Sequence, residues 1–450
     1  MSMESTQPAW SPPVYDVSTE PVLAHRGQLA ASRLSNNFAR WARWCPDGSA
    51  ALAQCEDATL QYLDIPSDTL GTPLASDAIR KACLPQSAPV LDFAWYPFAT
   101  TRDPASFCLV ASVRESPVKL LDAADGRLRA SYKIVDHRER HIAPHSLVFN
   151  MTGAKLYCGF EDAIEVFDLH APGEGTRLHT TPTKKSRDGL KGIISALAFS
   201  PDAASGAYAA GSLRVSAPSS SNIAIFSEST GEVPVMFVGD ERVGGYGVRA
   251  SVSQLQFNPY RPYLLYASFR RHSTIYSWDI RGDTTKTVQT FAREFESNGT
   301  NQRLRFDVDI TGSWLGAGDH HGGTSVFDLS SPENQDASTE VKAPNESKLH
   351  FKAHDDAVGS VHFHPLHPLL LSVSGSRHYT GGGDSDGSSS DLESANEEFN
   401  EDEDDISAPR RVAVRRTRER PSPTVKDASF KLWSFDRSSR LASETDSAHA

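Results

Sequence analysis

The sequence predicts an all-β fold in which a four-stranded unit is repeated around a closed ring, and three observations support this. Short segments with alternating or clustered apolar residues recur along the chain and are separated by turn residues. In the clearest stretch, residues 253–293, four such segments fill about 40 residues, which is the length of one WD-type propeller blade. The third of these segments ends in Ser277-Trp278-Asp279 and so carries the Trp-Asp pair typical of such repeats.

One such unit cannot bury both faces of its sheet, so further units must pack against it. The chain contains six of them, at residues 38–66, 89–133, 143–172, 193–239, 301–332 and 356–378. Seven units are enough to close a ring, and the predicted fold is therefore a seven-bladed WD40-type β-propeller.

The strand segments recur in the same order from unit to unit. The first unit contains RWARWC, ALAQCE and TLQYLD, and the connection 66–89 is long enough to hold its outer strand. The next units contain VLDFAW, FCLVASV, PVKLLDA and GRLRASYK, then HSLVF, KLYCGF and AIEVFDL, then ISALAF, GAYAAGS, NIAIFSES and PVMFVG. After residues 253–293 come RLRFDVD, WLGAG and TSVFDL, and finally VGSVHF and LLLSVSG.

The last unit is interrupted and incomplete. Its third strand, SFKLWSFD, returns only after residue 428, and no fourth strand follows it. We expect a segment near Val22-Leu23-Ala24 to complete the blade, because a borrowed N-terminal strand removes an exposed sheet edge. The expected division is a disordered tail at 1–20, propeller at 21–378, a disordered insert at 379–425, the completing strand at 426–436 and a disordered tail at 437–450.

The net charge comes from one segment. The chain of 450 residues has a formal charge of −12, but residues 381–407 alone contain eleven acidic residues and no Lys or Arg. The predicted propeller is therefore close to neutral, and the acidic total does not exclude a nucleic-acid partner. The five cysteines form no Cys-x-x-Cys pair and favour a reducing compartment. With no signal peptide and no run of about 20 apolar residues, we expect a soluble protein.

Two motifs superficially suggest chemistry. Residues 383–387, GDSDG, match a nucleophile elbow, but they lie in an acidic segment without the strand-to-helix turn that this motif requires. His362, His364 and His367 are spaced as H-x-H-x-x-H where a strand ends, and packed or solvated histidines are favoured there over metal ligands. With no phosphate-binding loop or zinc motif, we expect a non-enzymatic protein without cofactor or metal.

Basic residues recur at equivalent positions of the repeat. In a propeller, the turn between the second and third strands of a blade and the link to the next blade lie on the same face of the ring, which we call the top face. Such positions are occupied by Arg114, Lys184, Lys185, Arg187, Lys191, Arg214, Arg270, Arg271, Arg303, His320, His321, His354 and Arg377. They are opposed by Glu56-Asp57 and Glu161-Asp162.

This pattern favours an anionic partner on the top face, since arginine fits phosphate in a bidentate manner. Single-stranded RNA would suit a face that also offers Tyr246 and Tyr379 for stacking. The alternative is that these surface loops are simply polar.

Several strings resemble one known family. ASVRESPVKLLDAADGRLRASYK, APHSLVFNMTGAKLYCGFEDAIEVFD, KGIISALAFSP and TNQRLRFDVDITGSWLGAGDHHG are similar to the central blades of the telomerase Cajal body protein family, and the resemblance covers residues 37–377. It implies a nuclear WD propeller that binds a short single-stranded box in small Cajal body RNAs, including telomerase RNA, and delivers those ribonucleoproteins to nuclear bodies. The matching positions are Arg114-Glu115, His145-Ser146, Gly192-Ile193-Ile194 and Asn301-Gln302-Arg303.

The chain departs from the family pattern in three ways. The insert at 381–424 interrupts the last blade, only one unit keeps a literal Trp-Asp, and only Ala353-His354-Asp355 echoes the Gly-His signature. Three roles stay open: an RNA-binding scaffold for small nuclear or Cajal body RNA, a spliceosomal ribonucleoprotein assembly factor, and a protein-only adaptor for acidic or phosphorylated peptides. We expect a monomer with ribonucleoprotein partners and no membrane partner.

The insert carries two further predicted signals. Its arginine-rich part predicts nuclear import, in a protein that can also occur in the cytoplasm, through Arg410, Arg411, Arg415, Arg416, Arg418 and Arg420. Ser390 and Ser394 each stand three residues before a glutamate and are candidate phosphorylation sites. The acidic block could compete with RNA for the top face, and the alternative is a solvated linker.

Overall fold

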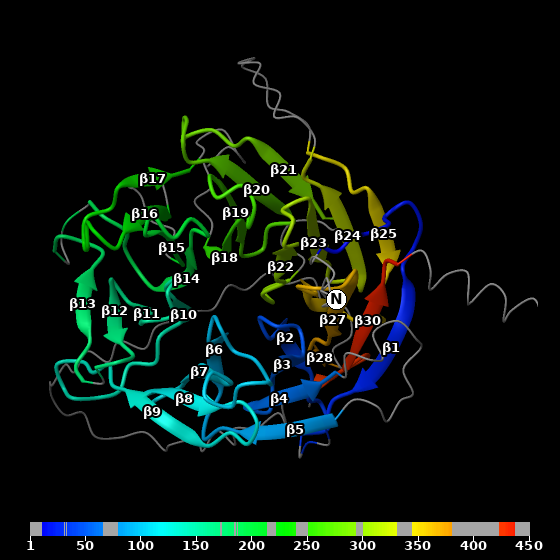
Figure 1. Ribbon diagram of the computed structural model, residues 1–450, viewed down its shortest axis with the longest axis horizontal. Coiled ribbons are helices and arrows are strands. Elements are labelled where there is room, and N and C mark those ends of the chain that lie inside the picture. The colour runs from blue at the N-terminus through cyan, green and yellow to red at the C-terminus, as the bar shows by residue number, and fades with distance from the viewer. Residues whose placement is uncertain are drawn as a thin grey trace, which may run out of the picture.

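The computed structural model confirms the predicted propeller. Thirty β-strands and no helix occur in the residues that the structure describes, which are 11–30, 32, 34–65, 80–171, 173–183, 186, 188–213, 222–239, 251–293, 300–330, 344–379 and 423–436. Seven four-stranded antiparallel sheets surround a central axis as the blades of a ring (Figure 1). No helix long and apolar enough to cross a membrane is found in this part of the chain.

In blades 1 to 6, the four strands follow one another along the chain and the first strand is innermost (Figure 1). Blade 1 contains β2 (Ala39–Trp44), β3 (Ala50–Cys55), β4 (Thr59–Asp64) and β5 (Arg80–Pro85), and blade 2 contains β6 (Val90–Trp95), β7 (Cys108–Val113), β8 (Val118–Asp122) and β9 (Leu128–Tyr132). Blade 3 contains β10 (Ser146–Phe149), β11 (Lys155–Phe160), β12 (Ala163–Asp168) and β13 (Thr176–His179). Blade 4 contains β14 (Ile194–Phe199), β15 (Ala207–Ser212), β16 (Ile223–Ser227) and β17 (Met236–Val238).

Blade 5 contains β18 (Val252–Phe257), β19 (Leu264–Phe269), β20 (Thr274–Asp279) and β21 (Gln289–Ala292). Blade 6 contains β22 (Phe306–Val308), β23 (Trp314–Gly318), β24 (Gly323–Asp328) and β25 (Leu349–Lys352). Blade 7 consists of β26 (Val358–Phe363), β27 (Leu369–Ser374), β30 (Ser429–Ser434) and β1 (Val22–Gln28). Between β27 and β30, the short strands β28 (His378–Tyr379) and β29 (Pro423–Thr424) pair with each other.

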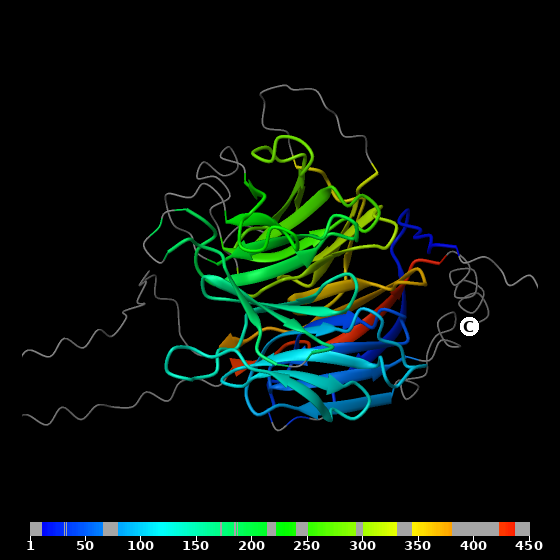
Figure 2. The same cartoon turned by 60° about the vertical axis from the view of Figure 1, so that its left-hand side comes forward.

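The N-terminal strand closes the ring. β1 pairs antiparallel with β30 as the outer strand of blade 7, with Leu23 opposite Trp433, and the two strands lie side by side in both views (Figures 1 and 2). The chain before β1 is also held in place, because Tyr15 is buried against blade 7 and its hydroxyl donates to the carbonyl oxygen of His364 at 3.2 Å. Both β1 and the segment that precedes it therefore join the two ends of the folded chain.

Neighbouring blades are joined by polar contacts near the axis. At each of the seven junctions, a side chain of one blade hydrogen-bonds the main chain of the next, and we call this set the junction ring. Its contacts are Gln54 Nε2 to Val90 O (2.6 Å), Leu147 N to Asp92 Oδ2 (2.9 Å), Ser146 Oγ to Ile194 O (2.8 Å), Ser195 Oγ to Val252 O (2.7 Å), Gln254 Nε2 to Phe306 O (2.7 Å), Phe363 N to Asp307 Oδ2 (2.9 Å) and Ala42 N to Ser360 Oγ (2.9 Å).

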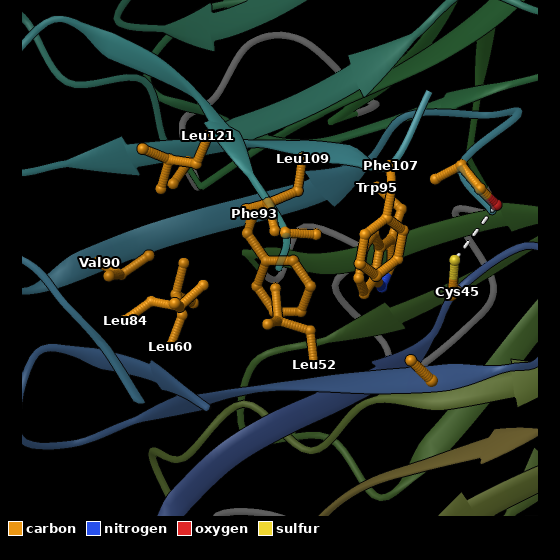
Figure 3. Packing of buried hydrophobic residues seen from close by; sticks show 14 of the residues in the cluster. Cys45, Leu52, Leu60, Leu84, Val90, Phe93, Trp95, Phe107, Leu109 and Leu121 are labelled. Atoms are coloured by element: carbon orange, nitrogen blue, oxygen red, sulfur yellow. Dashed lines mark hydrogen bonds between the residues drawn. The ribbon is translucent and has the colours of Figure 1, made fainter. Parts of the chain in front are cut away.

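The apolar core is divided in the same way. Seven clusters of buried apolar residues occur in the described chain, one between each pair of neighbouring blades. Between blades 1 and 2, Trp41 stacks on Phe93 with ring centroids 4.3 Å apart. Figure 3 shows this cluster, in which Trp95 lies against Phe107 and Cys45 forms a hydrogen bond. Each blade is thus stabilised mainly by its two neighbours, because its sheet faces are buried against them.

Two carboxylates hold the ends of the chain that interrupts blade 7. The buried Asp356, in the link before blade 7, accepts hydrogen bonds from Ser376 Oγ (2.5 Å) and Lys426 N (3.1 Å), and it lies 2.9 Å from His378 Nε2. Asp427 binds the other side of the same link, with Oδ2 3.2 Å from His354 Nδ1. Together with the β28–β29 pair, these contacts form a closed stem at the base of the interruption.

The histidines at the end of β26 are packing residues with separate partners. His364 is buried, with Nε2 3.0 Å from Gly48 O, while its Nδ1 accepts hydrogen bonds from the main chain of Leu366 and His367. His362 faces Asp307 at 3.4 Å instead. No group of three possible metal ligands comes together in the part of the chain that the structure describes.

Deleting residues 1–28 should destabilise the propeller and promote self-association. The deletion removes Tyr15 and Val17, which are both buried, and burying such side chains stabilises by about 1.5–3 kcal/mol each. It also leaves the edge of β30 unpaired, which favours strand addition between molecules. Thermal unfolding and sedimentation would measure both effects, with deletion of residues 1–10 as the control. A 1–28 deletion that unfolds at the same temperature as that control would contradict a closing role for β1.

The buried histidines should make the protein less stable in mild acid. Burial lowers the pKa of His364 to about 3, so the unfolded chain takes up a proton near pH 6.5 that the native protein does not accept until about pH 3. The stability present above pH 6.5 is therefore lost as the pH falls, at about 1.4 kcal/mol per pH unit for one histidine. Urea unfolding at several pH values should show a shallower acid slope in His364→Gln than in wild type. His170→Gln, at an exposed position, is the control, and equal slopes in all three proteins would contradict the assignment.

Candidate nucleic-acid interface

The top face is held together by main-chain contacts between the turns and the links. Glu56 N donates to Phe38 O (2.9 Å), Arg114 N to Pro89 O (3.1 Å) and Arg270 N to Ser251 O (2.8 Å). In each pair, the turn between the second and third strands of a blade binds the link that precedes the same blade. The turns and links are therefore on one face, and the predicted basic residues on them face the same end of the ring.

Glu56 forms ion pairs with two arginines of the top face. Its carboxylate is nearly buried, and it pairs with Arg40 Nε at 2.5 Å and with Arg377. Arg377 comes from the stem of blade 7, whereas Arg40 is in the innermost strand of blade 1. Arg40 was not among the residues predicted from the sequence, because the prediction was made for residues of turns and links and Arg40 lies in a strand. The shared carboxylate fixes both guanidinium groups on the top face and offsets one of their charges.

Three arginines of the top face lie outside the ion pairs of the described residues. Arg114 and Arg270 are exposed, and Arg303 is partly buried; none of them forms an ion pair in the part of the chain that the structure describes. Burial lowers the pKa of Arg303, Asp92 raises it in part, and the nearby Arg270 and Arg40 lower it again. Arg303 therefore lies close enough to Arg270 and Arg40 for mutual repulsion, which a bound anion would relieve.

His145 extends this cluster to blade 3. Burial lowers the pKa of its imidazole, and so do Arg303 and Arg114. Arg303 thus lies within electrostatic range of groups from several blades. We call Arg40, Arg114, His145, Arg270, Arg303 and Arg377 the basic cluster.

The link that carries Arg303 is bound to blade 7, and one of its side chains reaches across the ring. Gln302 Nε2 donates to Gly375 O of blade 7 at 2.9 Å, and Arg305 N donates to Gly359 O of the same blade at 2.9 Å. The Arg305 guanidinium then reaches Asp92 of blade 2 at 3.3 Å and stacks over the ring of Trp41 at 3.9 Å. Burial lowers the pKa of Arg305 to about 10. This buried pair joins the link before blade 6 to blade 2.

The remaining predicted contact residues have more varied surroundings. The Arg271 Nε atom donates to Asn301 Oδ1 at 2.5 Å, so the asparagine holds the arginine at the edge of the face. Lys191 is partly buried in the link before blade 4, where its carbonyl oxygen accepts a hydrogen bond from the Ser212 hydroxyl. The residues Lys184, Lys185, Arg187, Arg214, Tyr246, Ser390, Ser394 and the arginines at 410, 411, 415, 416, 418 and 420 lie outside the described residues.

One histidine assigned to the top face is not a surface cation. His354 is buried, with its Nε2 atom 2.7 Å from the hydroxyl oxygen of Ser372, to which Trp433 Nε1 also donates. Burial lowers the pKa of His354, which favours the neutral imidazole. His354 therefore has a structural role in blade 7. His320 and His321 lie against each other with ring centroids 3.8 Å apart, and burial lowers the pKa of His320.

Some of the residues that match the family strings also have structural roles. Ser146 and Ile194 form one contact of the junction ring. Gly192 N donates to Asp162 Oδ1 at 2.6 Å and so joins a link to its neighbouring turn. Asp162 is therefore engaged within the protein and, like Glu56, does not simply oppose the basic residues.

The closed seven-bladed ring defines the class of the protein as a WD-repeat propeller. No family model matches the chain. It is 30% identical over 373 residues to Telomerase Cajal body protein 1 of Rattus norvegicus, and the match covers 82% of this chain and 64% of that protein. A homolog of that protein from Drosophila melanogaster is 25% identical over 78% of this chain and 59% of its own length. Over most of its length, the chain is thus similar to the telomerase Cajal body proteins.

A fungal protein with another name is also similar. Guanine nucleotide-binding protein negative regulator 1 of Schizosaccharomyces pombe is 28% identical over 63% of this chain and 68% of its own length. The chain spans a little under two thirds of the rat telomerase Cajal body protein. The comparisons thus confirm the resemblance inferred from the sequence strings.

Replacing Glu56 with Gln should strengthen the binding of polyanions. The substitution frees Arg40 and Arg377 from their shared partner and so adds to the net positive charge of the basic cluster. Elution from immobilised heparin should require a higher salt concentration for Glu56→Gln than for wild type. Glu115→Gln is the matched control, since it removes one negative charge from an exposed neighbouring turn. Equal shifts in the two variants would mean that the Glu56 pairing has no specific effect.

Proposed function

We propose that the chain is a non-enzymatic RNA-binding scaffold that holds single-stranded segments of small nuclear or Cajal body RNA on its top face. The residues assigned to this role are Arg114, Lys184, Lys185, Arg187, Lys191, Arg270, Arg271, Asn301, Gln302, Arg303 and Arg377, to which we add Arg40. The observation that carries the proposal is the set of arginines Arg114, Arg270 and Arg303, which come from different blades and form no ion pair among the described residues.

The geometry of the cluster suits a flexible phosphate backbone. Guanidinium groups bind phosphate in a bidentate manner, and arginines spread over several blades can contact successive phosphates of one strand. Tyr379 is 61% exposed on the stem beside Arg377 and offers an aromatic surface for a base. RNA that is single-stranded can present both its phosphates and its unstacked bases to such a face.

The names of the relatives support the choice of RNA and of compartment. Both the rat and the Drosophila proteins are named for telomerase and for the Cajal body. We therefore propose nuclear residence, with small nuclear ribonucleoproteins as partners and telomerase RNA among the candidate ligands. The arginine-rich segment of the insert would supply the import signal.

Charge reversal at two exposed arginines should weaken RNA binding. Arg114→Glu combined with Arg270→Glu is expected to reduce the affinity for a short unstructured RNA by about tenfold or more and to flatten its salt dependence, because fewer counterions are released. Fluorescence anisotropy over a salt series would measure both quantities. Arg102→Glu is the matched control, since Arg102 is an exposed arginine in a turn on the opposite face, and circular dichroism would verify the fold of each variant.

Two outcomes would decide against this proposal. Wild-type affinity and salt slope in the folded double variant would show that the basic cluster is not the RNA site. Failure of the wild-type protein to bind RNA, together with tight binding of phosphorylated or acidic peptides that the double variant loses, would establish the protein-only adaptor instead.

A further inference from the structure

The opposite end of the ring exposes large apolar residues. We call it the bottom face; it carries the turns between the first and second strands of the blades. Of the large apolar residues that are exposed in the described chain, five lie in these turns, one each in blades 2, 3, 5, 6 and 7. They are Phe98 (56% exposed), Met151 (40%), Tyr260 (77%), Ile310 (41%) and Leu366 (41%).

These turns surround the mouth of a central cavity of about 490 Å³. One apolar residue from the corresponding turn of every blade lines it, and we call this set the apolar ring. Its members are Pro46, Pro97, Met151, Pro201, Pro259, Ile310 and Pro365. A cavity of this size is within the range that takes a small ligand or a large side chain.

The cavity extends from the turns of the bottom face along the inner strands of the ring. Its lining reaches up to Asp92 and Arg305, the buried ion pair that lies under the basic cluster, and includes none of the residues of that cluster. A molecule on the top face and a molecule in the cavity would therefore occupy separate sites.

One charge in the cavity has no opposite partner. Arg43, on β2, lines the cavity, and no carboxylate of the described residues pairs with it. Its neighbours Arg305 and His362 do not compensate for it, because they add positive charge or none. Asp92 is taken by Arg305, and Asp307 accepts hydrogen bonds from Phe363 N and Gln256 Nε2.

The acidic residues of the bottom turns are also engaged in their own turns. Asp47 accepts hydrogen bonds from Ser49 N and Oγ, and Asp309 accepts them from Ser313 N and Trp314 N. The carboxylate of Asp202 accepts one from Ala204 N. Arg43 is thus left as the charge that a ligand can neutralise.

We infer that the bottom face is a docking site for a partner protein, which inserts a large apolar side chain through the apolar ring and places an adjacent carboxylate on Arg43. The apolar ring removes the inserted side chain from water, which stabilises the complex in proportion to the apolar area buried. The exposed guanidinium selects a carboxylate by a charge-assisted hydrogen bond. This site is independent of the RNA proposed for the top face.

Selection from displayed short random peptides on the immobilised full-length protein tests this inference. Enriched peptides should pair Leu, Ile, Phe or Trp with a neighbouring Asp or Glu. A synthetic peptide of the enriched sequence should bind wild type and lose about tenfold or more in affinity for Arg43→Gln and for Ile310→Asp. Leu128→Asp, at an exposed apolar residue of β9, is the matched control and should bind as wild type does. The RNA affinity of all three variants should be unchanged.

Three results would overturn the inference. The first is an absence of enrichment for apolar residues beside acidic ones. The second is an enriched peptide that binds Arg43→Gln and Ile310→Asp as tightly as wild type while both variants show wild-type circular dichroism. The third is concentration-dependent dimerisation of the wild-type protein that Ile310→Asp abolishes, since this would identify a second copy of the chain as the occupant.

Discussion

The structure depends on closure of the ring, and the hydrogen bonds of the junction ring join each blade to the next. Each of its seven contacts spans two blades, and each uses a main-chain group of an inner strand that would otherwise be an unpaired polar group in a confined space. An apolar cluster at the same junction adds the bulk of the stabilisation, while the polar contact fixes the register of one sheet against the next. The last junction joins Ser360 of blade 7 to Ala42 of blade 1. A change in the packing of any blade would therefore strain the whole ring.

Closure also explains why the two faces differ. On the top face, the turns are bound to neighbouring links by main-chain hydrogen bonds, so their side chains are free to carry charge. On the bottom face, the turns between the first and second strands surround the central cavity, and apolar residues line its mouth. The Arg305–Asp92 pair separates the two regions. A single scaffold can therefore present one charged and one apolar surface without mixing them.

Much of the fold follows from local sequence, and part of the site does not. Apolar periodicity and turn residues are enough to locate most strands, since both act over a few residues. β25 was not assigned, because it follows a long connection that separates it from the rest of its blade. Arg40 was missed because nothing in a strand sequence shows that its side chain will meet Glu56. The burial of His354 depends on Ser372, Asp427 and Trp433, which lie far along the chain and come together only when blade 7 forms.

The stem of blade 7 allows the segment between β28 and β29 to vary in length. Since β28 pairs with β29 and Asp356 holds residues on both sides, the two ends of the interruption stay adjacent whatever lies between them. Loop-closure entropy then grows only with the logarithm of the intervening length, so that doubling it costs about 0.6 kcal/mol. The position is thus a point of tolerance in the propeller, where segments of very different length and composition can be accommodated without disturbing the blades.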